Sequence, residues 1–292
     1  MISLCSFAKI NLALVVKGLR ADGYHQIQTI YQAISLYDII QLEERPQGIE
    51  IETSCRELPT DSGNLVYRAC RRLQEVFKIA RGVKLRIDKR IPLGAGLGGG
   101  SSNAAVTLMG LVHLWALPQG RVHLYPIARE LGADVPYFLM GGSCLGVGRG
   151  DELYPLTDLP RWWVVLVVSP FSLSTAEVYR RANLMLTKRG NSSSINGFYL
   201  MERETERFMV NHLEEVVFPD YPALRRVKEE LEGLGAMGSL MSGSGPTIYG
   251  LFKEYKRAKR AQKSLISRGY KAILAHTLTR QDYQKRVLYV NY

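Results

Sequence analysis

The sequence predicts an α+β protein with two domains. Its 292 residues are enough for two domains with ordinary cores, and 46% hydrophobic with 22% charged residues is typical of a globular enzyme. Short alternating runs typical of strands are interleaved with runs of helical period. Near residues 156–160 the composition changes to Pro, Thr and Asp, which predicts a boundary between residues 1–157 and residues 158–292.

Composition also excludes several classes of protein. No run of 18 apolar residues is present, and Met1 leads into patterned sequence without a signal peptide, so we expect a cytoplasmic protein that does not bind membranes. The four cysteines form no C-x-x-C pair, which favours buried free thiols over metal ligands or disulfides. They are Cys5, Cys55, Cys70 and Cys144.

A formal net charge of +11 raises the possibility of nucleic-acid binding. Much of the excess lies between residues 253 and 286, where five basic residues share one helix-like segment, residues 256–263. A solvated helix face explains these charges more simply. A positive field would also favour small anionic substrates.

The first strands and helix follow from alternation and helical period. Residues 2–7 and 11–17 are predicted to be strands broken around residues 8–10, and residues 28–36 and 38–42 are predicted to be strands joined at Tyr37. Asn64 is expected to cap a helix through Ala80. The strand at residues 83–87 then leads into a glycine-rich loop.

This loop has five glycines between residues 94 and 100. Glycine buries nothing and costs backbone entropy, so such a run indicates positive φ angles or close approach to a ligand. The sequence turns helical from Ser101, with Ser101 or Ser102 suited to the N-cap. A helix N-terminus favours anions, and the serine hydroxyls could reach a phosphate or its magnesium ion. The loop therefore predicts a phosphate site.

Other glycine loops fit less well. The Gly-Lys-Ser/Thr ending of a Walker A loop is absent. Gly94, Gly96 and Gly99 satisfy G-x-G-x-x-G, but the second strand and acidic residue of a dinucleotide fold do not follow. The H-R-D and D-F-G signatures of protein kinases are missing as well.

Beyond the loop, a helix is predicted from Arg121 to Leu131, and Pro136 is expected to end it. Residues 144–148 are compatible with a strand that closes the first domain. The second domain is predicted to contain strands at residues 162–168, 247–252 and 271–275, a helix bearing Tyr179, helices at residues 199–216 and 221–231, and a basic helix after residue 253. Residues 188–196 are expected to form a polar loop, and residues 279–292 an edge strand or tail.

Two glycine motifs carry a resemblance to a known family. Residues 92–105 resemble the phosphate-binding motif of the GHMP kinase superfamily, and residues 242–247 resemble its third motif. The resemblance implies a two-domain GHMP kinase fold, with a ribosomal-protein-like N-terminal domain and a ferredoxin-like C-terminal domain. It implies an ATP site formed by Pro92, Leu93, Gly94, Ala95, Gly96, Leu97, Gly98, Gly99, Gly100, Ser101 and Ser102.

Further motifs are similar to the branch that phosphorylates the 2-hydroxyl of 4-diphosphocytidyl-2-C-methyl-D-erythritol, in the non-mevalonate isoprenoid pathway. The resemblance of residues 7–12 implies a catalytic Lys9, and that of residues 132–136 implies that Asp134 is the general base, kept ionised by Lys9. It implies that Tyr24, His25 and Tyr179 recognise the cytosine. The expected substrate site also includes Asn11, Ser242, Gly243, Ser244 and Gly245.

The expected ligands are therefore ATP, Mg²⁺ and a cytidine-diphosphate-linked alcohol, without nucleic acid or membrane, in a monomer or weak homodimer. The sequence shows no clear glutamate ligand for magnesium, so the protein ligands of the metal stay open. Two alternatives remain. One is another GHMP small-molecule kinase, of homoserine or mevalonate type, and the other is a non-enzymatic RNA-binding protein.

Overall fold

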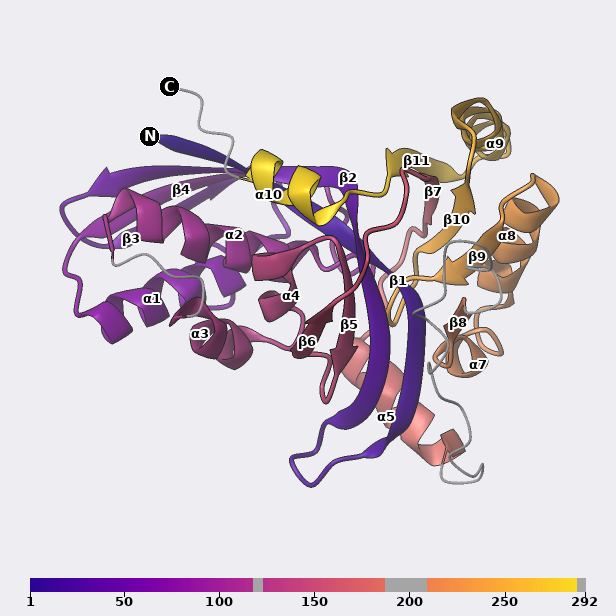
Figure 1. Cartoon of the computed structure of the whole chain (residues 1–292), viewed down its shortest axis with the longest axis horizontal. Helices are drawn as coiled ribbons and strands as arrows, with labels where there is room; N and C mark the ends of the chain where they lie inside the picture. The colour runs from indigo at the N-terminus through magenta and orange to yellow at the C-terminus, as the bar shows by residue number, and fades with distance from the viewer. Residues whose placement is uncertain (118–122, 187–208, 288–292) are drawn as a thin grey trace.

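A computed structural model describes residues 1–117, 123–186 and 209–287 of the chain. Two β-sheets stand side by side, each with helices packed on it, and the long strands β1 and β2 run between them (Figure 1). Within the described residues the first sheet has seven strands and the second has four. The predicted α+β class is confirmed.

The first sheet is built on two long antiparallel strands, β1 (Ile2–Leu19) and β2 (His25–Arg45). The predicted breaks around residues 8–10 and at Tyr37 are wrong, because both strands continue through them. Shifts in pairing register occur between Phe7 and Lys9 and between Asn11 and Ala13. Such irregularities bend a strand and re-aim its side chains without ending it, and they are common next to active sites.

The other strands of this sheet extend it on both sides. The order is β3 (Ile49–Thr53), β4 (Gly82–Asp88), β2, β1 and β8 (Val210–Asn211), while β5 (Ser143–Val147) pairs with β2 and with β6 (Glu152–Pro155). The predicted strand at residues 83–87 is thus confirmed. The helix predicted at residues 199–216 is wrong at residues 210 and 211, which pair in parallel with β1 as strand β8. Its last residues, 214–216, are helical, in a short helix that ends at Val217.

Four helices cover one face of this sheet (Figure 1). They are α1 (Leu65–Phe77), α2 (Gly99–Leu114), α3 (Leu124–Leu131) and α4 (Val135–Met140). The Asn64 side chain accepts the N–H of Val66 at the start of α1, as predicted. A serine does not cap α2, which begins at Gly99 after Gly98. Nor does Pro136 end a helix; it lies in the first turn of α4, where its missing N–H costs nothing.

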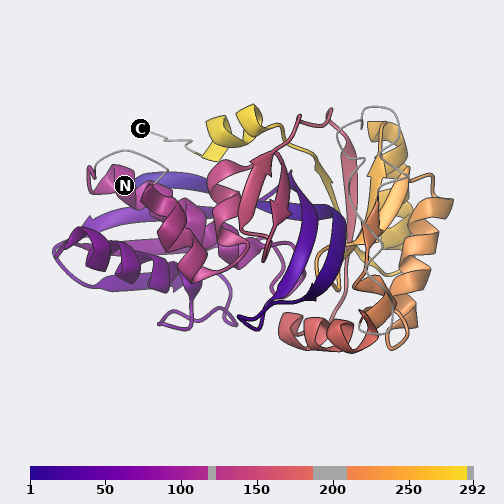
Figure 2. The same ribbon diagram turned by 60° about the horizontal axis from the view of Figure 1, so that its bottom comes forward.

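The second sheet has the strand order β11 (Lys271–His276), β7 (Trp163–Val168), β10 (Ile248–Phe252), β9 (Gly238–Met241), all antiparallel. This order is that of a ferredoxin-like layer, as predicted. Its helices are α5 (Thr175–Leu186), α7 (Glu214–Val217), α8 (Pro222–Gly233) and α9 (Tyr255–Ser267). Turning the molecule shows α5 beneath the β1–β2 hairpin (Figure 2). Lys256, Arg257, Arg260 and Lys263 are exposed on α9, which confirms the solvated basic face.

The C-terminal helix α10 (Arg280–Val287) returns to the first sheet (Figure 1). Its buried Tyr283 packs against Phe7, with ring centroids 5.6 Å apart, and its hydroxyl donates to the carbonyl of Phe138 at 2.6 Å. The described part of residues 279–292 is therefore a helix, which the sequence did not predict. The polar loop expected at residues 188–196 lies outside the described residues.

Three apolar cores stabilise this arrangement. One lies between the first sheet and α1 to α4, and a second lies between the second sheet and its helices. A third joins β1 and β2 to β7 and β10, and it includes Ile91, Ala95 and Leu97 from the glycine-rich loop. The loop is thereby anchored where the two sheets meet.

Candidate active site

A cavity of about 920 Å³ opens at the junction of the two sheets. Residues from both halves of the chain line it, including most of the residues that the sequence predicted for the site. Those in the lining are Lys9, Asn11, Tyr24, His25, Pro92 to Ser101, Asp134, Tyr179, Gly243 and Ser244. Ser102, Ser242 and Gly245 are not part of the lining.

The glycines of the first loop are required by positive φ and by close contacts. Gly94, Gly96 and Gly98 have φ of 58°, 74° and 69°. A Cβ on Gly96 would lie 2.1 Å from the carbonyl oxygen of Ser242, and one on Gly98 would lie 2.7 Å from the ring of Phe138. Only glycine permits this backbone path and this packing.

The loop is also tied to the strands beneath it. The backbone N–H of Lys9 donates to the carbonyl of Leu97 at 3.0 Å. The fully buried Asp38 accepts the N–H groups of Arg90 and Ile91, each at 2.7 Å, and the ammonium of Lys89 at 2.7 Å. A carboxylate with three donors fixes the entry to the loop before any ligand binds.

The two serines at the start of α2 differ in their surroundings. Ser101 lines the cavity. Ser102 is fully buried and accepts a hydrogen bond from Ser6 at 2.8 Å. Ser101 is therefore the serine placed to face a phosphate, together with the N-terminal amides of α2.

Lys9 and Asp134 lie together on the cavity wall. The ammonium of Lys9 is 3.6 Å from Oδ2 of Asp134 and donates to Asn11 Oδ1 at 2.5 Å. The hydroxyl of Tyr31 donates to Oδ1 of Asp134 at 2.9 Å. Lys9 is 3% exposed; burial lowers the pKa of its ammonium, and the Asp134 carboxylate opposes that shift. The pair gives one site a carboxylate that accepts a proton and a cation that attracts developing negative charge.

An aromatic group forms another part of the cavity. The rings of His25 and Tyr179 have centroids 5.2 Å apart, tilted by 39°. Nε2 of His25 is buried and has no hydrogen-bond partner in the described part of the chain, and burial lowers the pKa of this imidazole. A buried polar atom without a partner points to a ligand that satisfies it. Tyr24 lies nearby, half exposed, with the guanidinium of Arg149 over its ring.

The second glycine turn touches the first. Ser242 Oγ donates to the carbonyl of Gly96 at 2.9 Å, and the Ser244 and Thr175 hydroxyls are 2.9 Å apart. A Cβ on Gly243 would lie 3.3 Å from Nζ of Lys9. The buried Asn211 of β8 holds this turn by donating to the carbonyls of Met241 and Gly243, each at 2.8 Å. Ser242 therefore does not line the cavity itself but holds the first glycine loop, which does.

Comparison with known proteins identifies the family of the chain. The model for the GHMP kinases N terminal domain matches residues 64–142, and that for the GHMP kinases C terminal matches residues 193–272. A 4-diphosphocytidyl-2-C-methyl-D-erythritol kinase of Alkaliphilus metalliredigens is 43% identical over 272 residues, which cover 90% of this chain and 92% of the relative. A relative of the same name from Acetivibrio thermocellus is 37% identical, over 95% of this chain and 99% of its own.

The chain belongs to the 4-diphosphocytidyl-2-C-methyl-D-erythritol kinase family of GHMP kinases.

Solved structures give the same placement. A crystal structure of a 4-(cytidine 5'-diphospho)-2C-methyl-D-erythritol kinase superposes with a TM-score of 0.82 at 34% identity, covering 94% of this chain and 99% of the other. A homoserine kinase from Cytophaga hutchinsonii gives 0.71 at 20% identity, covering 96% of this chain and 95% of the other. The mevalonate kinase of Methanococcus jannaschii gives 0.73 at 13% identity, covering 95% and 98%. The last two share the fold alone. The predicted GHMP kinase fold is confirmed.

Several residues of the site were not predicted from sequence. Tyr31 and Asp38 lie in alternating strand patterns, where an aromatic or polar residue gives no distinct signal. Lys89 and Asn211 act through contacts with residues distant in sequence. Arg149 follows residues 144–148, which the sequence suggested were a strand closing the first domain, and the glycines on either side of it were the one available signal.

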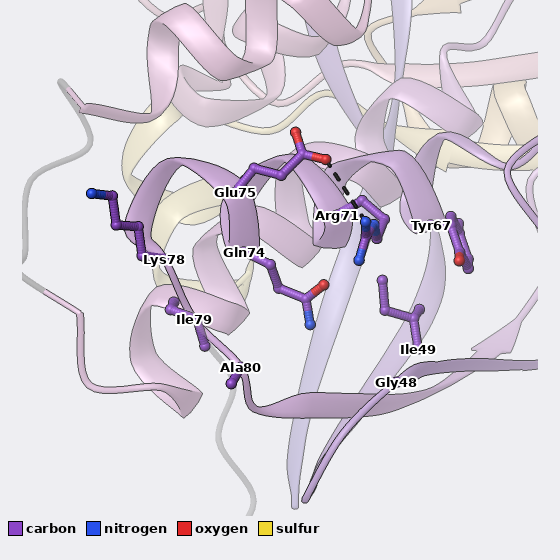
Figure 3. A pocket seen from close by; sticks show the side chains of 9 residues that line it. All are labelled: Gly48, Ile49, Tyr67, Arg71, Gln74, Glu75, Lys78, Ile79 and Ala80. Carbon is purple, nitrogen blue, oxygen red and sulfur yellow. Dashed lines mark ion pairs between the residues drawn. The ribbon is translucent and has the colours of Figure 1, made fainter.

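A smaller hollow of about 440 Å³ lies away from this site, on α1 and the start of β3 (Figure 3). Its side chains include an ion pair, with Arg71 and Glu75 4.0 Å apart. None of the predicted site residues lines it. Among the described helices, none is long and apolar enough to cross a bilayer.

Proposed function

We propose that this chain transfers the γ-phosphate of ATP to the 2-hydroxyl of 4-diphosphocytidyl-2-C-methyl-D-erythritol. The observation that carries the proposal is the single cavity, which joins the glycine loop, the Lys9–Asp134 pair and the aromatic group around His25. The named function of relatives 37–43% identical along nearly the whole chain supports it. A cytoplasmic location, expected from the sequence, belongs to the same proposal.

In this proposal the nucleotide phosphates lie against the loop at residues 92–101 and the N-terminus of α2. The substrate hydroxyl lies between Lys9 and Asp134. Asp134 accepts the hydroxyl proton as the oxygen forms its bond to the γ-phosphorus, and the bond from that phosphorus to the β–γ bridging oxygen breaks to release ADP. Lys9 attracts the negative charge of the reacting oxygens.

Magnesium fits this site as part of the nucleotide substrate. In the described residues, no cluster of three or more histidine, cysteine, aspartate or glutamate side chains could hold a metal ion. Mg²⁺ in kinase sites usually keeps several waters and is held largely by substrate phosphates. We propose that it enters with ATP, that Ser101 of the cavity lining would be available to contact it, and that it would supply neutralisation of phosphate charge.

The aromatic group is assigned to the cytosine. A pyrimidine ring can stack on Tyr24 and on Tyr179, and its polar edge can satisfy the unpartnered nitrogen of His25. Base stacking on aromatic side chains contributes about 1–3 kcal/mol per base. An alcohol without a base would leave these contacts unmade, which is the basis of the proposed selectivity.

The test is ATP consumption by the purified chain with Mg²⁺, comparing 4-diphosphocytidyl-2-C-methyl-D-erythritol, homoserine and mevalonate. Turnover confined to the cytidine compound is the expected result. Turnover with homoserine or mevalonate alone would overturn the substrate while keeping the kinase. Size-exclusion chromatography of the same sample tests the expected monomer or weak homodimer.

A further inference from the structure

Arg149 is a charged residue of the cavity wall to which the reaction assigns no role. It lies in the tight turn between β5 and β6, between two glycines with positive φ, Gly148 at 69° and Gly150 at 96°. Its guanidinium carbon is 4.7 Å from the centroid of the Tyr24 ring. The turn lies beside the β1–β2 hairpin, because β5 pairs with β2 and the N–H of Ile27 donates to the carbonyl of Gly148 at 2.8 Å.

The guanidinium is held in place by groups other than Tyr24. Its Nη2 donates to Asp151 Oδ2 at 2.7 Å and to the carbonyl of Arg129 at 3.3 Å. The carboxylate of Asp151 is largely buried and also faces the guanidinium of Arg129, at 3.6 Å. Because these contacts do not involve the cavity, Arg149 is oriented before a ligand enters.

Tyr24, in contrast, has little support of its own. It is 51% exposed, and its backbone is fixed by the hairpin turn, in which its N–H donates to Asp22 and its carbonyl accepts the N–H of Arg20. Arg149 is the one charged or aromatic side chain of the described residues that stacks on its ring. A cation over an aromatic face is attracted by the ring quadrupole, which restricts the ring to one orientation.

Local charge argues against Arg149 being a free cation for a substrate phosphate. Asp151, which also faces Arg129, pairs with it at 2.7 Å. The carboxylate of Asp22, which binds Arg20, is close enough for Arg149 to add to the lowering of its pKa by the Tyr24 N–H and Arg20. The Nη2 of this guanidinium already donates to Asp151 and to the carbonyl of Arg129, so fewer of its five N–H groups remain for an incoming anion, while its face lies over the Tyr24 ring.

We propose that Arg149 is a positioning residue for substrate specificity, which covers one face of Tyr24 and so presents the other face to the cytosine. The inference rests on the proposed function, because it assigns the partner of Tyr24 in base binding. Arg149 contacts neither reacting group; it acts through the orientation of one ring.

The first experiment replaces Arg149 with Met in the full chain. Since cation–π pairs contribute about 0.5–2 kcal/mol, the KM for the cytidine substrate should rise by about 2- to 30-fold. The kcat and the KM for ATP should stay unchanged, because the glycine loop and the Lys9–Asp134 pair are not touched. Arg129→Met is the matched control: it removes an arginine from the same aspartate but none from Tyr24, and should leave both KM values unchanged.

A double-mutant cycle with Tyr24→Ala separates positioning from direct contact. If Arg149 acts through the ring, Arg149→Met should add nothing to the loss already caused by Tyr24→Ala. Additive losses would overturn the proposal and indicate direct binding of the substrate. Arg149→Lys keeps a cation near the ring and should recover part of the lost affinity, which tests the same point if the Met variant folds poorly.

The affinities of the wild-type chain and of Arg149→Met for cytidine and for CDP distinguish a failure of the Arg149 proposal from a failure of the proposed function. Under the Arg149 proposal, Arg149→Met weakens both ligands by the same factor, because the shared base is what Tyr24 contacts. A loss confined to CDP would overturn it in favour of a phosphate contact, and unchanged affinity for both ligands would also overturn it. If the wild-type chain binds neither ligand and does not turn over the cytidine substrate, the proposed function fails first.

Discussion

Lys9 and Asp134 meet across 125 positions of sequence because β1 and the start of α4 lie on one cavity wall. Each has a second partner that limits its freedom: Asn11 holds the ammonium, and Tyr31 holds the carboxylate. Burial that lowers the pKa of Lys9 also strengthens its attraction for a nearby anion. The two side chains are thus oriented in advance, which is the main requirement of phosphoryl transfer.

The first prediction concerns Asp134→Asn. The amide keeps the shape and the neighbours of the carboxylate but accepts a proton poorly, so kcat should fall by about 10²- to 10⁴-fold. Nucleotide affinity and thermal stability should change little. The measurement is steady-state turnover together with ATP binding; turnover close to that of the wild type would remove Asp134 from the role of base.

The second prediction concerns His25 and pH. Burial lowers the pKa of the imidazole below its usual value, so the ring is neutral over a wider range of pH than that of a free histidine. The KM for the cytidine substrate should therefore be constant at and above neutral pH and change as the pH falls through the lowered pKa. Removing the ring in His25→Ala should raise this KM by about 5- to 150-fold, since a lost hydrogen bond to a buried partner costs about 1–3 kcal/mol.

The exposed His113 provides the control, because His113→Ala removes a histidine from α2 outside the cavity. It should leave both the KM and its pH dependence unchanged. Equal losses of affinity for ATP and for the cytidine substrate in His25→Ala would show that His25 is structural.

Sequence reasoning at the residue scale reached the residues that lie in motifs and missed those that act through space. Lys9, His25 and Asp134 were found from short segments that resemble the family, and the structure brings them to one cavity. Tyr31 touches Asp134 from 103 positions away. A tyrosine at an inward position of a strand is expected to pack in the core, so no local pattern identified Tyr31 as a site residue.

Secondary-structure elements show the same division. The glycine loop, the Asn64 cap and three strands of the second sheet were predicted correctly because their signals are local. The ferredoxin-like order of that sheet was implied by the family resemblance. The break expected in β1 was wrong because the polar Lys9 resembles a strand end, whereas here it lines the cavity from a continuous, irregular strand. The break expected at Tyr37 was wrong because β2 continues through that residue, whose ring packs against Phe7. Pro136 was misread because the same residue suits both the end of one helix and the first turn of the next.

The third prediction tests the contact between the two glycine turns. In Gly96→Ala, the new Cβ would meet the carbonyl of Ser242 at 2.1 Å, so one of the two loops must move. Gly235→Ala is the matched control, with φ of 88° and nothing within 4 Å of its Cβ. Both variants carry the cost of a left-handed alanine, about 1–2 kcal/mol. Only Gly96→Ala should also raise the KM for ATP, measured beside the free energy of unfolding. Equal KM values for ATP in the two variants would show that the contact between Gly96 and Ser242 does not shape the ATP site.

At the scale of the whole molecule, the site depends on how the second sheet is joined to the first. Besides the third apolar core, the buried hydroxyl of Tyr249 on β10 donates to the carbonyl of Asn11 on β1 at 2.8 Å. Asn11 in turn binds the ammonium of Lys9. Asn11 therefore connects the contact between the two sheets to Lys9, the proposed catalytic residue.

The fourth prediction follows for Tyr249→Phe. Loss of the buried hydrogen bond should lower the free energy of unfolding by about 1–3 kcal/mol. It should also lower kcat, because Asn11 loses a support. Tyr270→Phe is the control, since its hydroxyl binds Glu230 at the outer side of the second sheet. Urea unfolding and turnover are the measurements, and an unchanged kcat in Tyr249→Phe would separate stability from activity.

Strand β2 has one more consequence for a kinase that recognises a base at one place and phosphorylates an alcohol at another. His25 and Tyr31 lie on that one strand, so the proposed base contact and the partner of Asp134 are separated by six residues, roughly 20 Å along an extended chain. The strand therefore fixes the distance between these two contacts. Under the proposed function, substrates should be selected by the distance between their base and their hydroxyl as well as by the chemistry of each. A shorter alcohol arm on the same cytidine diphosphate should bind the aromatic group without bringing its hydroxyl to the phosphate.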